Sequence, residues 1–380
     1  MTNLSAPVFM QASASPTAHH MSIGLRRMVV SGVQALLLST ALAAWASTTA
    51  FGAREPSPIY KQLRDWVLVC ENTRRCDARA LVENSPAIIS VEREAGPDTP
   101  VTVRIRGKGV LRADSLRIDG EPGGLPIFGW RTDQTADGAS SVLSISGESA
   151  RTVIEALLKG KTLTLSTEAK DAIISLSGIT AALLAMDEWQ GRLDTPGALV
   201  RIGPLLESRV HRAWPMPVVS RRAMSAPAAD AAMIAPVRAA RQYSLDDECD
   251  GGPQTPRDRI VGLTDVEVLV FLECRRGAYQ SSFIPLRVRR DAPDNPERLI
   301  LPWTESAFAF GAEKDFEPVY EPATGMLTMS GRGRGQGDCG FLGEWQFNGR
   351  EFDLTFYSEQ RICAGLPMDW PVHYRTESRR

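Results

Sequence analysis

The segment GRGRGQG at residues 331–337 has the most unusual side-chain chemistry in the sequence, because two arginines alternate with glycines. The guanidinium groups of Arg332 and Arg334, together with backbone N–H groups that no side chain shields, suit a phosphate, sulfate or carboxylate. The segment is not a P-loop, since no Lys followed by Ser or Thr comes after it. A flexible hairpin that lets Cys339 reach a partner is the second explanation of the glycines. Arg332 and Arg334 are therefore candidate anion-binding residues, although the hairpin is the favoured explanation of this segment.

Carboxylates beside cysteines form the next group of candidates. Asp338 and Glu344 flank Cys339, and two carboxylates can serve as the acid and base of a glycan-cleaving enzyme. A second acidic group surrounds Cys249 and consists of Asp246, Asp247, Glu248 and Asp250. This group lacks the alternating oxygen ligands and the distal Glu of a calcium loop. Neither group has a diagnostic spacing, and surface solvation beside a disulfide is the favoured interpretation of the acidic group around Cys249.

Histidine is scarce, with four residues in the 380-residue chain. His373 follows a strand-like pattern near the C-terminus, where a packed or hydrogen-bonded imidazole is expected. No Gly-x-Ser-x-Gly sequence accompanies it to suggest a serine hydrolase. The sequence therefore assigns no catalytic residue, no metal ligand and no cofactor, and it favours a protein that is not an enzyme.

The six cysteines are even in number, which in an exported chain indicates disulfides. No Cys-x-x-Cys occurs, which weakens the interpretations as a zinc ribbon and as a thioredoxin-like site. Sequence proximity favours the pairs Cys70–Cys76, Cys249–Cys274 and Cys339–Cys363, although the last four cysteines can exchange partners. Each longer loop that is closed in this way is expected to add about 3 kcal/mol of stability.

The N-terminal residues predict export. Arg26 and Arg27 precede an uncharged stretch over residues 28–46 that ends in Ala-Trp-Ala, as in a signal peptide of residues 1–46 with cleavage between 46 and 53. An uncleaved membrane anchor is the alternative. Cleavage removes two positive charges from a chain of formal charge −2, which leaves −4, and it leaves two histidines, His211 and His373. We therefore expect a protein of the Gram-negative periplasm, or a secreted one, with no stable membrane anchor.

Two regions rich in β-branched residues flank a Pro/Ala-rich stretch. The fold class predicted is mainly β, with two disulfide-stapled, β-sandwich-like domains at residues 60–203 and 241–380 joined by a linker at 204–240. Two helices, over 151–158 and 179–189, are expected to pack over a sheet of the first domain. Strands are expected at 66–70, 87–92, 101–106, 141–146, 162–167, 173–177, 267–274, 281–289, 326–330, 344–347, 353–356 and 372–375.

Residues along the whole mature chain carry a resemblance to a known family. These are the run DWVLVC at 65–70 before Cys76, the tract DCG at 338–340 with Glu344 and Trp345, the tract CAG at 363–365, and the closing WP at 370–371. In these residues the chain resembles an uncharacterised exported bacterial family with six cysteines, domain of unknown function 1176. Its front half is also similar to the invasion-associated locus B proteins, through the Trp before a Cys, the Lys159-Gly160 turn and the segment SLSG at 175–178. This second resemblance implies a small periplasmic β-domain linked by name to envelope or invasion phenotypes, and it does not imply catalysis.

The charge balance of 43 basic and 45 acidic residues argues against a nucleic-acid partner. We therefore expect a non-enzymatic binding or envelope-interaction module with an unidentified envelope or protein partner. The alternatives are an envelope hydrolase of glycan or peptide that uses Asp338 or Glu344, and a protein inhibitor of an envelope or host enzyme.

Overall fold

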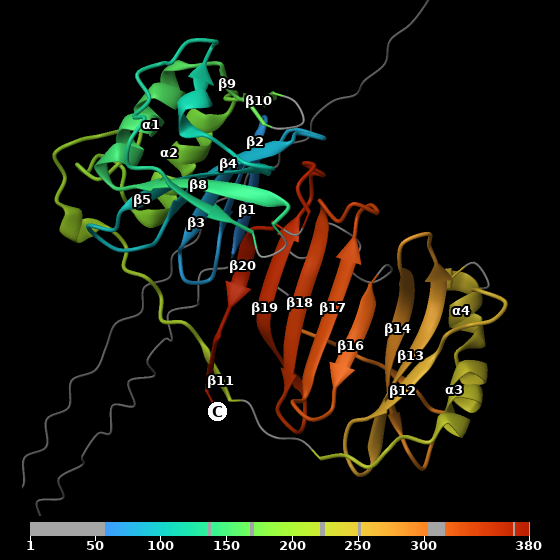
Figure 1. The fold of residues 1–380 in the computed structure, drawn as a ribbon. Helices are drawn as coiled ribbons and strands as arrows, with labels where there is room; N and C mark the ends of the chain where they lie inside the picture. Colours follow the sequence, from blue (N-terminus) through green and yellow to red (C-terminus); the bar gives the residue numbers. More distant parts are fainter. Residues whose placement is uncertain are drawn as a thin grey trace, which may run out of the picture. The chain divides into compact units, whose positions relative to one another are not determined.

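The computed structural model describes residues 58–135, 138–167, 171–220, 225–249, 252–302, 316–367 and 369–379. The predicted signal peptide and its cleavage region lie outside these ranges, as does Asp250. The chain is mainly β, as predicted, and most of its strands pair in antiparallel sheets (Figure 1). Within the described residues, no helix is both long and apolar enough to cross a bilayer. The division into two domains and a linker stays a prediction.

The first half of the chain contains a seven-stranded antiparallel sheet and a smaller sheet of three strands. In spatial order the larger sheet comprises β1 (Ile59–Leu63), β2 (Trp66–Cys70), β3 (Cys76–Ala80), β4 (Ala87–Arg93), β5 (Val101–Lys108), β8 (Ser140–Ser146) and β7 (Arg131–Gln134). The smaller sheet comprises β10 (Ala172–Ser175), β9 (Thr162–Leu165) and β6 (Arg117–Ile118), and a short 3₁₀ helix η1 (Ala113–Ser115) precedes β6.

Two helices cover these sheets, α1 (Glu148–Lys159) and α2 (Ile179–Gln190), as the sequence predicts. Their buried side chains recur every three or four residues, including Val153 and Leu157 in α1 and Leu183 in α2, which places one face of each helix in the core. Gly178, the N-cap residue of α2, has a φ of 107°, and a Cβ there would lie 2.0 Å from the Leu63 carbonyl oxygen. A glycine is therefore required where the chain enters α2 beside β1.

The second half contains a four-stranded and a five-stranded sheet, both antiparallel. The first comprises β12 (Arg259–Gly262), β13 (Glu267–Arg276), β14 (Ser281–Arg289) and β15 (Glu297–Arg298). The second comprises β16 (Glu317–Glu321), β17 (Met326–Arg332), β18 (Gly340–Phe347), β19 (Phe352–Gln360) and β20 (Val372–Arg375). Successive side chains of β13 pack into two different cores. Val268 and Val270 pack in the core that contains Val237 and Leu245, whereas Leu269 and Phe271 join a core shared with the five-stranded sheet.

Residues 204–249 hold several short elements that the sequence did not predict. These are η2 (Glu207–Arg209), β11 (Val218–Ser220), η3 (Ala231–Met233), α3 (Ile234–Ala240) and α4 (Gln242–Cys249). β11 pairs in parallel with β21 (Glu377–Arg379) near the C-terminus. Pro236 lies in the first turn of α3, where its missing N–H has no intrahelical partner to lose, so the proline does not prevent the helix.

Polar contacts join the first sheet to the last one. Asn72 lies after β2, and its side chain exchanges two hydrogen bonds with the Arg375 backbone on β20, of 3.0 and 3.1 Å. The Arg375 guanidinium also donates to the Glu71 carboxylate at 2.8 Å. An apolar cluster lies nearby, in which Val67 and Val69 pack with Leu366.

The structure contains the disulfides Cys70–Cys76, Cys249–Cys274 and Cys339–Cys363, which are the pairs that sequence proximity favours. The first closes the end of the β2–β3 hairpin, and the second fastens α4 to β13. The third joins the residue before β18 to the loop after β19.

Replacing Cys339 and Cys363 together by alanine is expected to lower the free energy of unfolding by about 3 kcal/mol, because the unfolded chain gains the entropy of an open loop. Urea unfolding under non-reducing conditions measures this loss. The matched pair Cys70→Ala/Cys76→Ala opens a much shorter loop, of sequence separation 6 against 24, and should cost less. A loss below 1 kcal/mol for the longer loop contradicts the expectation.

Candidate functional site

The glycine-rich segment lies between β17 and β18, and its second arginine has a structural partner. The Arg334 guanidinium donates two hydrogen bonds to the Asp338 carboxylate, one of them with Nε and Oδ1 2.7 Å apart. Asp338 is fully buried and also accepts from the Gly365 N–H at 2.6 Å. Arg332 is exposed, and its backbone N–H donates to the Gln280 side chain. The contacts of Arg334 agree with the hairpin alternative, and anion binding by Arg332 and Arg334 stays a prediction.

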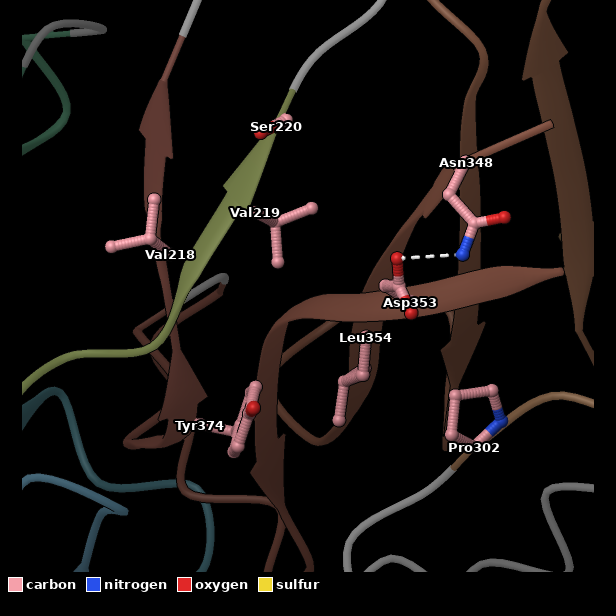
Figure 2. A pocket seen from close by; sticks show the side chains of 8 residues that line it. All are labelled: Val218, Val219, Ser220, Pro302, Asn348, Asp353, Leu354 and Tyr374. Atoms are coloured by element: carbon pink, nitrogen blue, oxygen red, sulfur yellow. Dashed lines mark hydrogen bonds between the residues drawn. The ribbon is translucent and has the colours of Figure 1, made fainter.

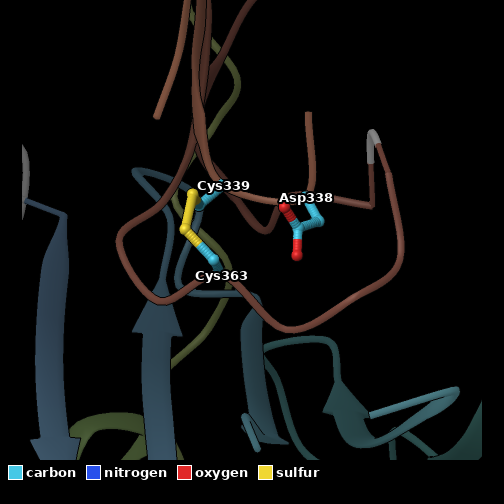
Figure 3. Close-up of side chains that lie close together, drawn as sticks. All are labelled: Asp338, Cys339 and Cys363. Atoms are coloured by element: carbon cyan, nitrogen blue, oxygen red, sulfur yellow. A yellow bond between two sulfur atoms is a disulfide. The ribbon is translucent and has the colours of Figure 1, made fainter. Parts of the chain in front are cut away.

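Asp338 has little freedom to act as a catalytic acid. The hydrogen bonds from Arg334 hold the pKa of its carboxyl below the ordinary value. Potential ligand atoms of Asp338, Cys339 and Cys363 lie within 4.8 Å of one another (Figure 3). The two sulfur atoms are bonded to each other in a disulfide, so neither offers the thiolate that a metal ion needs.

His373 is fully buried between the rings of Tyr60 and Tyr357, with ring centroids 6.0 and 5.6 Å away. Burial, followed by the positive charge of Arg361, lowers the pKa of His373 to about 3. A neutral imidazole enclosed in this way packs the fold, as the sequence predicts.

An open pocket of about 530 Å³ lies beside β11 (Figure 2). It is lined by Val218, Val219, Ser220, Pro302, Asn348, Asp353, Leu354 and Tyr374. Asp353 is the charged residue of this described lining, and the Asn348 amide donates to its carboxylate at 3.0 Å. The chemistry of this pocket selects no particular class of ligand.

A second pocket, of about 580 Å³, has more selective chemistry and is called the arginine pocket below. Its walls come from the end of β4, the loop into β5, the start of α1 and the segment after α2. The lining residues are Arg93, Asp98, Thr99, Pro100, Val101, Gly147, Glu148, Arg151, Glu155, Pro196, Gly197 and Glu207.

Two guanidinium groups in the arginine pocket share one backbone oxygen. Arg93 Nη1 donates to the Gly197 carbonyl oxygen at 2.6 Å, and Arg151 Nη2 donates to the same oxygen at 2.7 Å. Arg93 Nε and Arg151 Nη1 also donate to carbonyl oxygens, those of Thr99 and Ala198. Two positive charges are thus held side by side by neutral acceptors, which orient them without neutralising them.

A third guanidinium, that of Arg192, is fully buried and, like Arg93, donates to Thr99. Its Nη2 donates to Thr99 Oγ1 at 2.7 Å, and its Nε donates to the Gln190 side chain at 2.9 Å. Burial, followed by the charges of Arg192 and Arg151, lowers the pKa of Arg93 to about 9. The surroundings therefore disfavour the positive charge on Arg93.

Two carboxylates partly compensate these three guanidiniums. Asp187 is fully buried and accepts hydrogen bonds from the Leu199 and Val200 N–H groups. Glu207 accepts from the Gly197 N–H, and its Oε2 lies 4.0 Å from Arg192 Nη1. Neither carboxylate forms a hydrogen bond with Arg93 or Arg151 among the described contacts. Within the described residues, the hydrogen bonds of Arg93 and Arg151 thus go to backbone carbonyl oxygens and not to carboxylates.

The start of α1 adds donors to the same pocket. Gly147 and Glu148 line the pocket, and the N-cap residue Gly147 supplies no side-chain cap to the first turn. The first N–H groups of a helix lack intrahelical acceptors and carry the positive end of its dipole. The sequence prediction missed this site, because Arg93, Arg151 and Arg192 are far apart in the chain and are positioned by backbone carbonyls.

Comparisons with known proteins give a family and no activity. The family described as "Protein of unknown function (DUF1176)" matches residues 60–377. The chain is 26% identical over 343 residues to the uncharacterised protein YpfG of Escherichia coli strain K12, an alignment that covers 84% of this chain and 94% of YpfG. No solved structure matches the chain. The match over residues 60–377 shows that the chain belongs to the DUF1176 family.

Proposed function

We propose that this protein is an exported, non-enzymatic binding module whose arginine pocket holds the anionic group of a ligand. The observation that carries the proposal is the placement of Arg93 and Arg151 on the single carbonyl oxygen of Gly197. An anion between the two guanidiniums forms charge-assisted hydrogen bonds and removes part of their mutual repulsion.

The proposed compartment is the periplasm. The three disulfides suggest an oxidising, exported environment, because cytosolic thiols are kept reduced. The predicted signal peptide and the similarity of the front half to the invasion-associated locus B proteins stay predictions that point to the same compartment. An envelope molecule with an anionic group is the expected partner.

Arg93 is suited to bind rather than only to support the fold. The residue is 4% exposed and lines the pocket, and its Nη2 has no hydrogen-bond partner in the described part of the chain. A bound phosphate or carboxylate supplies an acceptor for that nitrogen and for the first turn of α1. The site thus offers directed donors on two sides of an incoming anion.

Substituting Arg151→Gln is expected to weaken binding of ethyl phosphate at least tenfold, because one of the paired charges is lost. Isothermal titration calorimetry of the purified protein in low-salt buffer measures this change. The Arg151 side chain is 21% exposed, so its removal perturbs the core less than removal of Arg93. Arg131→Gln on the exposed strand β7 is the matched control, since it removes the same charge elsewhere.

The control is expected to bind as the wild type does, and Arg93→Gln to bind no more tightly than Arg151→Gln. Circular dichroism establishes that each variant is folded. Absence of ethyl phosphate binding by the wild type contradicts the proposal, as does an equal loss for Arg131→Gln and Arg151→Gln.

A further inference from the structure

The rim of the arginine pocket carries charges opposite to those of its arginines. Glu148 and Glu155 lie on α1 seven residues apart, which places both on one face of the helix, and Arg151 lies between them. Asp98 lines the pocket from the loop before β5. The described pocket thus combines guanidiniums with a group of carboxylates.

These rim carboxylates are only loosely engaged. Glu148 Oε1 lies 3.8 Å from Arg151 Nε, and the Glu148 side chain is 95% exposed. Asp98 and Glu155 are exposed and accept no hydrogen bond from another described residue. Glu207 differs from them, because the Gly197 N–H and Arg192 already engage its carboxylate. Asp98, Glu148 and Glu155 are therefore available to a cationic group.

The rim changes which ligand the pocket favours. A ligand that is only anionic gains from Arg93 and Arg151 but is repelled by Asp98, Glu148 and Glu155. A ligand that also carries an ammonium group is attracted by these carboxylates, because the ammonium is a positive charge with three N–H donors that rotate freely. The volume of about 580 Å³ lies within the range of small-molecule sites and leaves room for two groups separated by several bonds.

We propose that the natural ligand is zwitterionic, with its anionic group on the Arg93–Arg151 pair and a primary ammonium group beside Glu148 and Glu155. This inference rests on the proposed function and names the ligand class of the same pocket. An aminoalkyl phosphate, either free or as the headgroup of a lipid, has this chemistry.

Two probes that differ by one ammonium group test the inference. The wild-type protein is expected to bind O-phosphoethanolamine at least tenfold more tightly than ethyl phosphate in calorimetry. The double variant Glu148→Gln/Glu155→Gln should reduce this ratio to about one. The matched control Glu121→Gln/Glu188→Gln removes two exposed carboxylates outside the pocket lining and should keep the wild-type ratio.

The outcomes separate the two proposals. If ethyl phosphate binds and depends on Arg151 but the wild-type ratio is one or less, the zwitterion is wrong and the anion site stands. The same conclusion follows if Glu148→Gln/Glu155→Gln leaves a high ratio unchanged. If neither probe binds, both proposals are wrong. If both probes bind as expected, flotation with phosphatidylethanolamine vesicles, compared with phosphatidylcholine vesicles, distinguishes a lipid headgroup from the free compound.

Discussion

Replacing Arg79 by methionine is expected to lower the free energy of unfolding by about 3–5 kcal/mol, because it leaves the Asp77 carboxylate buried without its partner. Arg79 and Asp77 are each 4% exposed on β3, and Arg79 donates two hydrogen bonds to Asp77. Although burial opposes its charge, Asp77 and Asp369 raise the pKa of Arg79, so the Arg79 guanidinium keeps its positive charge at all ordinary pH values. Chemical denaturation of the purified protein measures the loss.

Arg79 also links β3 to the end of β19. Its Nη1 donates to the Gln360 side chain at 3.4 Å, and Gln360 in turn donates to the Asp338 carbonyl oxygen at 2.7 Å. The double variant Asp77→Asn/Arg79→Met removes both charges and is expected to be more stable than Arg79→Met alone. An unfolding free energy of Arg79→Met within 1 kcal/mol of the wild type contradicts this description. A double variant that is less stable than Arg79→Met also contradicts it.

Acid is expected to destabilise the fold through His373. Its pKa is about 3 in the folded protein and about 6.5 in the unfolded chain, so only the unfolded chain binds a proton between these values. Above pH 6.5 His373 makes no contribution to the pH dependence. As the pH falls below 6.5, stability is lost by about 1.4 kcal/mol per pH unit until the pH approaches 3.

The variant His373→Gln isolates this contribution. Burial raises the pKa of Glu359 and of Glu71 in the folded protein. These carboxyls bind protons more readily in the folded state, so they increase stability as the pH falls, whereas His373 decreases it. The difference in unfolding free energy between the wild type and His373→Gln, measured at several pH values between 7 and 4, removes these shared terms. The wild type should lose its advantage progressively over this range. A difference that is independent of pH shows that His373 is protonated in the folded state as readily as in the unfolded chain.

Much of the β-framework is predictable from local pattern. The apolar runs in β2, β13 and β14 have strong signals, and α1 and α2 show apolar spacings of three and four. These elements form where the sequence predicts them. At least one face of each of these elements packs against a core, so the positions of the apolar residues in the sequence follow the period of the strand or helix.

Other elements have no such local signal. The sequence of β3 is CDARA, and its polar residues are buried only because Asp77 and Arg79 pair with each other and with distant groups. α3 contains Pro236, and both α3 and α4 are short. They are stabilised by packing on β13, which the sequence of these helices does not reveal.

The candidate site is less predictable than the fold for a related reason. The motif with Arg332 and Arg334 stands out by spacing, but Asp338 lies four residues beyond Arg334 and engages it. Arg93 and Arg151 stand alone in their segments and become a pair only through the Gly197 carbonyl oxygen. No residue-type pattern encodes a shared backbone acceptor, so only the tertiary structure reveals the pair.

The central claim is that an anion binds between Arg93 and Arg151. Crystals of the protein soaked in selenate, with data collected at the selenium absorption edge, locate the bound anion directly. We predict an anomalous difference peak with selenate oxygens within about 3 Å of Arg93 Nη2 and the Arg151 guanidinium. Anomalous peaks at Arg332 and the glycine-rich segment, with none in the arginine pocket, contradict the claim.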